Sequence, residues 1–99
     1  MTKLTNDGSR SPYEVRMSLQ AEKSLQELRP RHLAETAMSF IYNELRFDPT
    51  EFGEYGRKLS GKLKGNHSAR RRKFRVIYRI GKDVIEILEF QPTPYPGVN

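Results

Sequence analysis

Residues 57–82 read RKLSGKLKGNHSARRRKFRVIYRIGK and hold eleven Lys and Arg with no Asp or Glu. The rest of the chain holds the other 7 basic residues and all 12 acidic ones, so the segment carries +11 and everything else sums to −5. The end of the segment alternates between two faces, with Phe74, Val76, Tyr78 and Ile80 on one and Arg75, Ile77 and Arg79 on the other. A period of two is typical of a strand. The basic run therefore belongs to folded structure, and its concentration predicts a surface for an anionic partner.

The composition of the whole chain limits the classes of protein to consider. Its 99 residues suit one small domain, which we place at 13–95 between a flexible N-terminal tail (1–12) and a C-terminal tail (96–99). The absence of Cys excludes disulfides, thiolate metal sites and a Cys nucleophile, and fits a reducing cytoplasm. Two isolated His argue against a metal site, so no cofactor or metal is expected. No apolar run has the length of a membrane span, so no membrane partner is expected.

The N-terminal half predicts a strand followed by two helices. Residues 13–17 alternate apolar and charged, which favours a short half-buried strand. Ser18 is a suitable N-cap for an amphipathic helix over residues 19–28. A second apolar stripe recurs every four residues over 31–46, and Pro49 ends it. We expect two antiparallel helices joined by a tight corner.

Between the helices and the last strands lies a segment rich in glycine. Residues 50–56 (TEFGEYG) predict an acidic loop. Gly61 and Gly65 follow among basic residues, where glycine admits positive φ or a close backbone approach to a phosphate. The GxxxxGK[ST] pattern of a nucleotide-binding P-loop is absent, so this segment is not predicted to be one.

The last third predicts three strands, over residues 68–72, 74–80 and 84–91. Gly81-Lys82 suits a two-residue type II′ hairpin turn because glycine comes first. The third strand divides its apolar residues between both faces, with Ile85 and Ile87 on one and Val84, Leu88 and Phe90 on the other. Such a strand is expected inside the sheet. The fold class is therefore α+β, with a strand and a two-helix hairpin packed on a mainly antiparallel, twisted sheet of about four strands.

A more specific signal comes from the spacing of glycines, arginines and the last strands. The pattern comprises Leu59, Gly61, Leu63, Lys64 and Gly65, then Ser68-Ala69-Arg70-Arg71 and Phe74-Arg75-Val76-Ile77-Tyr78. Together with the order of elements, it resembles the RelE/ParE superfamily of bacterial toxins, and most closely its RelE-like branch. The resemblance covers roughly residues 13–95 and implies a small RelE-like fold.

The resemblance also implies a function and partners. It implies the toxin of a type II toxin–antitoxin system, acting in the bacterial cytoplasm and bound by an acidic cognate antitoxin in a hetero-oligomer. RelE-like members enter the ribosome and cut mRNA there, so a ribosome-dependent endoribonuclease that inhibits translation is the leading hypothesis. One alternative is a ParE-like, non-enzymatic inhibitor of DNA gyrase. Another is a catalytically weakened member that keeps its RNA or antitoxin contacts.

The resemblance assigns roles to individual residues. Arg75 matches the arginine expected at the scissile phosphate, Arg70 would brace the phosphate, and Tyr95 would stack on a base or assist proton transfer. An arginine cluster suits this chemistry because it binds phosphate bidentately and stabilises added negative charge. The remaining candidates are assigned to RNA binding: Lys62, Lys64, Arg71, Arg72, Lys73 and His67.

Some positions carry competing interpretations. RelE-like chains usually have a basic pair where this chain has Phe90 and Gln91, so one catalytic cation is missing. His67 is assigned to RNA with a general acid or base role possible, but a surface or packing histidine is the stronger interpretation. Tyr78 is expected in the core, and Arg79 is expected either to pair with a glutamate or to contact RNA.

Overall fold

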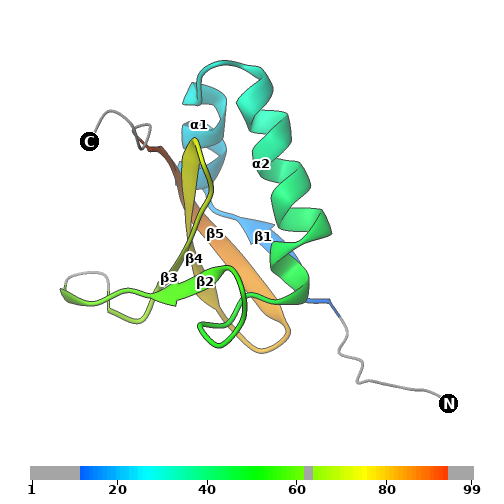
Figure 1. The fold of residues 1–99 in the computed structure, drawn as a ribbon, viewed down its shortest axis with the longest axis vertical. Helices are drawn as coiled ribbons and strands as arrows, with labels where there is room; N and C mark the ends of the chain where they lie inside the picture. Colours follow the sequence, from blue (N-terminus) through cyan, green and yellow to red (C-terminus); the bar gives the residue numbers. More distant parts are fainter. Residues whose placement is uncertain (1–11, 62–63, 94–99) are drawn as a thin grey trace, which may run out of the picture.

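The computed structural model describes residues 12–61 and 64–93, which form two helices and a five-stranded sheet (Figure 1). The elements in chain order are β1 (Glu14–Met17), α1 (Leu19–Glu27), α2 (His32–Asn43), a 3₁₀ turn η1 (Leu45–Phe47), β2 (Gly56–Lys58), β3 (His67–Arg70), β4 (Phe74–Ile80) and β5 (Val84–Pro92). This architecture confirms the predicted α+β class. In the described part of the chain, no helix is long and apolar enough to cross a membrane.

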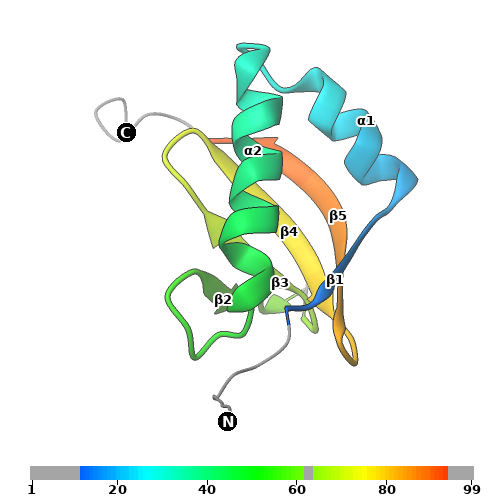
Figure 2. The same ribbon diagram turned by 90° about the vertical axis from the view of Figure 1, so that its right-hand side faces the viewer.

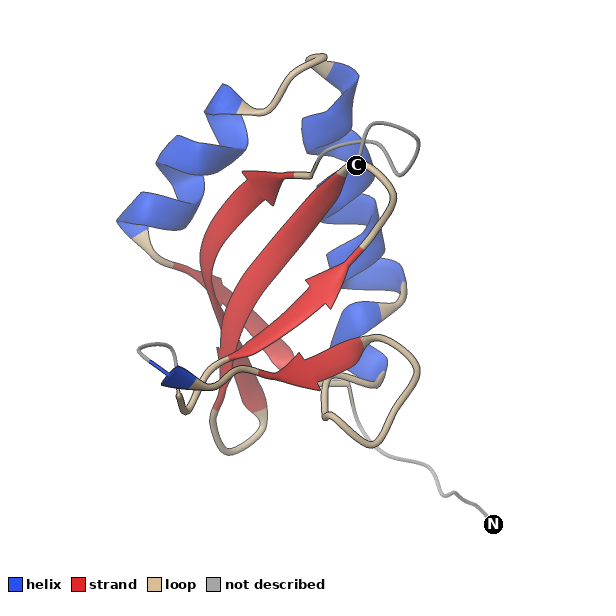
Figure 3. Ribbon diagram, turned by 60° about the vertical axis from the view of Figure 1, so that its left-hand side comes forward, coloured by secondary structure: helices blue, strands red, loops and turns tan. Residues whose placement is uncertain are grey.

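The sheet has the strand order β1-β5-β4-β3-β2, in which β1 runs parallel to β5 and every other pair is antiparallel. Both helices lie on one face of the sheet (Figure 2), and Figure 3 looks onto the other face, which they leave open. The sequence pattern predicts about four strands. The additional strand is β2, which pairs with β3 from Gly56 opposite Ala69 to Lys58 opposite His67. Three residues beginning with glycine are too short to show a period of two, so this strand was missed.

The two helices begin close to where their sequences predicted. The Ser18 side chain accepts from the Ala21 N–H at 3.0 Å, which confirms Ser18 as the N-cap of α1. The second helix ends at Asn43, earlier than predicted, and the chain continues through the 3₁₀ turn to Pro49. A 3₁₀ turn is a common way for an α-helix to end.

The hydrophobic core lies between the helices and the covered face of the sheet. Its buried members are Ala21, Leu28, Leu33, Ala37, Phe40, Ile41, Leu45, Ala69, Phe74, Val76, Tyr78, Ile85, Ile87 and Phe90. Tyr78 is fully buried, as predicted, and its hydroxyl donates to the Pro49 carbonyl at 2.6 Å. Burial raises the pKa of this phenol far above its ordinary value. The strand that carries Arg75 is therefore anchored through its opposite face.

A β-bulge in β5 changes which of its side chains face the core. Ile77 pairs with Glu89 but Tyr78 pairs with Ile87, so Leu88 is the extra residue. Phe90 therefore lies in the core with Ile85 and Ile87, and the predicted division of these residues between opposite faces is wrong. A period of two cannot reveal one inserted residue.

Serine side chains of the α1 segment bond to the backbone of the bulge. Ser18 Oγ donates to the Leu88 carbonyl at 3.1 Å, and Ser24 Oγ accepts from the Phe90 N–H at 2.9 Å. Buried backbone groups need such partners, because leaving them without one costs free energy. The bulge is therefore held by the helix that covers it.

The β4–β5 connection also differs from its prediction. The residue with positive φ in this connection is Asp83 at 62°, and not Gly81, where a type II′ turn beginning with Gly81-Lys82 requires it. The Gly81 N–H donates to the Val84 carbonyl at 2.7 Å. This bond continues the register in which Ile80 lies opposite Ile85, so Lys82 and Asp83 form the tip, and aspartate tolerates a left-handed conformation better than most residues. The predicted type II′ turn is therefore wrong.

Candidate functional site

The open face of the sheet gathers basic side chains from neighbouring strands. The cross-strand partners Arg70 and Arg75, and Arg57 and Ser68, lie on this face. Together with the loop before β2 they border a cavity of about 470 Å³. Its lining residues are Glu54, Tyr55, Arg57, Ser68, Arg70, Arg71 and Arg75. Two antiparallel pairings thus bring arginines that are far apart in sequence to one site.

Among the described residues, the side chains that line this cavity carry a surplus of positive charge. Arg70 and Arg75 stand directly opposite each other, and like charges in this position destabilise a sheet. Within residues 12–61 and 64–93, neither of them nor Arg57 forms an ion pair with a carboxylate. An anion bound between these side chains would remove the repulsion, so the arrangement is suited to a phosphate group.

Arg75 is oriented by a neutral partner. Its Nε and Nη2 donate to the Gln91 carboxamide oxygen at 3.1 and 2.7 Å. In the sequence, Gln91 is distinguished only by the absence of the expected cation. Phe90, its neighbour in the expected basic pair, is 2% exposed and lies in the core. Of these two positions, only that of Gln91 belongs to the candidate site.

Arg71 lies at the rim, where its guanidinium stacks on aromatic rings. Its central carbon is 4.9 Å from the centre of the Phe40 ring and 5.6 Å from that of Tyr55. The Tyr55 hydroxyl donates to the Glu44 carboxylate at 2.9 Å, and this bond is the main cause that raises the pKa of Tyr55. Arg71 lines this cavity and also a second one, and therefore lies between the two.

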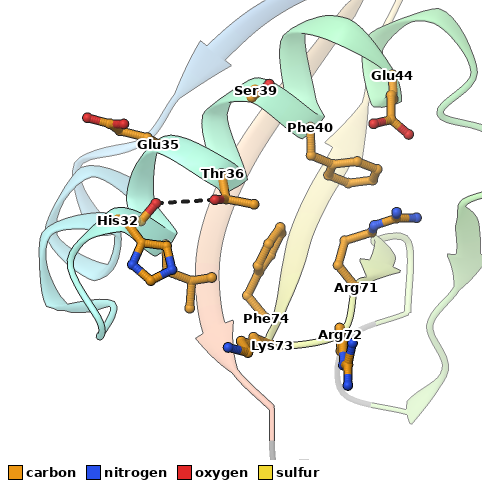
Figure 4. Close-up of a pocket in the computed structure, with 11 residues that line it drawn as sticks. His32, Glu35, Thr36, Ser39, Phe40, Glu44, Arg71, Arg72, Lys73 and Phe74 are labelled. Atoms are coloured by element: carbon orange, nitrogen blue, oxygen red, sulfur yellow. Dashed lines mark hydrogen bonds between the residues drawn. The ribbon is translucent and has the colours of Figure 1, made fainter.

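A second cavity, of about 590 Å³, lies between α2 and the β3–β4 turn (Figure 4). Its lining residues are His32, Leu33, Glu35, Thr36, Ser39, Phe40, Glu44, Arg71, Arg72, Lys73 and Phe74. The predicted RNA-binding residues Arg72 and Lys73 line this cavity and not the one beside Arg75. The basic run is therefore divided between two places.

His67 is placed away from the arginines. It lies on the same face as its cross-strand partner Tyr78, with ring centroids 5.7 Å apart, and its side chain is 11% exposed. Its Nε2 lies 2.8 Å from Glu51 Oε1, and this hydrogen bond is the largest cause that lowers the pKa of Glu51. The placement fits the interpretation of a packing histidine.

Of the three remaining predicted residues, one lies within the described part of the chain. Lys64 is exposed in a turn, where its N–H donates to the Gly61 carbonyl at 3.1 Å. Lys62 and Tyr95 lie outside the described residues. In the part of the chain that is described, no group of three or more His, Asp or Glu is close enough to hold a metal ion.

The sequence pattern alone does not identify Arg57, Ser68 and Gln91 as members of the site. Arg57 belongs to the undetected strand β2, and Ser68 lies across from it. The alternation of Ser68 with Arg70 would have placed both side chains on the face of the sheet that also carries Arg75. Strict alternation would place Gln91 on the same face as Ile87, so the sequence pattern does not reveal that the β-bulge brings Gln91 to Arg75.

The chain is similar to known proteins, although no protein-family model matches it. It is 35% identical over 79 residues to Toxin RelE of Mycobacterium tuberculosis, across 78% of this chain and 77% of that protein. It is 38% identical over 69 residues to Toxin RelG of the same organism, across 70% and 75%. The toxin–antitoxin complex RelBE2 from M. tuberculosis contains a chain that matches with a TM-score of 0.75 and 30% identity, across 84% of this chain and 100% of that one. The YoeB–YefM complex from Staphylococcus aureus has a TM-score of 0.62 at 16% identity, across 85% and 100%, which shows a shared fold alone.

Proposed function

Because this chain belongs to the RelE-like family of toxins, we propose that it is the toxin of a type II toxin–antitoxin pair and an endoribonuclease that cleaves mRNA on the ribosome. The observation that carries the proposal is the arginine-lined cavity on the open face of the sheet. Arg75 and Arg70 face each other there without a carboxylate partner in the described part of the chain.

The chemistry follows from what arginine does. Cleavage by the RNA's own 2′-OH adds negative charge to the phosphate in the transition state, and guanidinium groups held in place stabilise that charge. Arg75 contacts the scissile phosphate and Arg70 braces it or the next one, while Arg57 adds charge at the edge of the cavity. Arginine stays protonated and cannot act as a base. The proton transfers therefore need another group, a role we assign to Tyr95.

The partner is an acidic antitoxin that covers the basic surface. The +11 segment 57–82 supplies the charge for this contact as well as for RNA. The chain matched in RelBE2 belongs to a toxin–antitoxin complex, which supports the same assembly for this protein. Both partners act in the bacterial cytoplasm.

Induced expression in a bacterial host tests the proposal. Translation should stop within minutes and leave transcripts cut at defined codons, while Arg75→Ala relieves both effects. Arg79→Ala is the matched control, because Arg79 is on the same strand but is paired with Glu86. Growth arrest with intact mRNA and inhibited DNA gyrase would support the ParE-like alternative instead. No growth defect beside a stable antitoxin complex would indicate a binding module without activity.

A further inference from the structure

Gln91 lies directly across the β4–β5 ladder from Arg75. Its carboxamide oxygen accepts from both Nε and Nη2 of that arginine, at 3.1 and 2.7 Å, and both side chains are partly buried. Arginine offers donors only, so the amide must present its oxygen to Arg75. The two hydrogen bonds therefore fix the plane of the guanidinium group.

These bonds leave the binding edge of Arg75 available. A guanidinium has five N–H donors, and Gln91 takes one on Nε and one on Nη2. The three that remain are on Nη1 and Nη2, which form the fork that binds a phosphate bidentately. Gln91 thus orients the arginine through one edge and leaves the other for RNA.

A second arginine on β4 has a partner of different chemistry. Arg79 Nη2 bonds to a Glu86 carboxylate oxygen, again directly across the ladder, and Arg79 is exposed where Arg75 is partly buried. That carboxylate neutralises its arginine. The amide of Gln91 keeps Arg75 in place without reducing its charge.

The bulge places Gln91 at this position. With Leu88 as the extra residue, Ile87 faces the core, while Glu89 lies opposite Ile77 and Gln91 lies opposite Arg75. Without the insertion, the alternation that buries Ile87 would turn Gln91 toward the core as well. Ser24 bonds to the backbone next to Gln91 through the Phe90 N–H. The position is thus built by contacts from α1.

We propose that Gln91 is a positioning residue, which orients Arg75 toward the scissile phosphate through a neutral acceptor and so preserves its full charge. The inference rests on the proposed function. The inference gives a reason for the amide at position 91, where the family resemblance leads one to expect a cation. Gln91 orients Arg75 and does not itself add a second positive charge.

Single-turnover cleavage of mRNA on programmed ribosomes tests the inference, with Gln91→Glu, Gln91→Leu and the control Glu86→Gln. Gln91→Glu keeps an acceptor but neutralises Arg75, and should lower the cleavage rate roughly 100-fold. Gln91→Leu frees the guanidinium but keeps its charge, and should lower the rate about 10-fold. Glu86→Gln should match wild type. A merely structural role predicts the reverse order, so Gln91→Glu at or above the rate of Gln91→Leu overturns the inference.

A spectroscopic measurement keeps the inference separate from the proposed function. The Arg75 Nε–H signal in nuclear magnetic resonance should exchange slowly with water in wild type and Gln91→Glu, and quickly in Gln91→Leu. An unchanged signal in Gln91→Leu overturns the positioning role, whether or not wild type cleaves RNA. Wild type that cuts no mRNA refutes the proposed function alone. Thermal unfolding of each variant confirms that it folds.

Discussion

Replacing Tyr78 by phenylalanine tests whether its buried hydroxyl stabilises the fold without taking part in the chemistry on the open face of the sheet. The variant loses a hydroxyl that is fully buried and donates to the Pro49 carbonyl at 2.6 Å. A lost hydrogen bond that leaves a buried carbonyl without its donor costs about 1.5 kcal/mol. Unfolding of 99 residues has an entropy of about 0.2 kcal/mol/K. The melting temperature should therefore fall by about 7 °C.

Urea unfolding and RNA cleavage below the melting temperature measure the two effects. With a slope of about 1 kcal/mol/M, the urea midpoint should fall by roughly 1.5 M, while the cleavage rate stays within twofold of wild type. An unchanged urea midpoint would refute the claim that this hydroxyl anchors the chain at Pro49 to β4. A large loss of cleavage by folded Tyr78→Phe would instead place Tyr78 in the site.

The same phenol predicts a dependence on alkaline pH. Its pKa is raised in the folded protein, so its contribution to stability is complete below the unfolded pKa of about 10 and is lost as pH rises through the folded pKa. Phenylalanine does not ionise. The stability difference between wild type and Tyr78→Phe should therefore shrink above pH 10, and a constant difference would contradict the assigned cause.

Three further substitutions test the close packing around Gly56, the hydrogen bond from the β-bulge to Ser24, and the hydrogen bond between Glu51 and His67. Gly56→Ala should destabilise the fold by about 2 kcal/mol, because a Cβ there would lie 2.6–2.7 Å from three oxygen atoms, and an unchanged urea midpoint would contradict this. Ser24→Ala should cost about 1–2 kcal/mol by removing the acceptor of the Phe90 N–H, and calorimetry checks it. Glu51→Gln should weaken stability at neutral pH, and wild type should approach it as pH falls below 4.5, because the hydrogen bond with His67 lowers the pKa of Glu51. Urea titrations that keep the two proteins equally far apart in acid would contradict that cause.

The strands and helices with a clear period were predictable from the sequence. The alternation over residues 74–80 is reproduced as β4, and Ser18 caps α1 as its hydroxyl and position suggested. These patterns can be recognised within one segment, because the spacing of its apolar residues shows which side chains face the core. The core position of Tyr78 followed from the same alternation.

The assembly of the candidate site was less predictable, because it depends on register between strands. Arg57 entered the site through a three-residue strand whose identity comes from pairing with β3. Gln91 belongs to the site because of one inserted residue in β5. The position of His67 beside Tyr78 fits the packing interpretation that the sequence favoured. Tertiary contacts decide the positions of Arg57 and Gln91, and neighbouring residues in sequence carry no signal for them.

Mapping cuts in an mRNA bound to purified ribosomes, with wild type beside Arg75→Ala and Arg79→Ala, tests the central claim most directly. Wild type and Arg79→Ala should cut at the codon in the ribosomal A site, and Arg75→Ala should be slower by about 100-fold or more. The same mRNA without ribosomes should stay intact. Equal cutting by all three proteins, or no cutting by wild type, would contradict the assignment of the arginine cavity as the site of RNA cleavage.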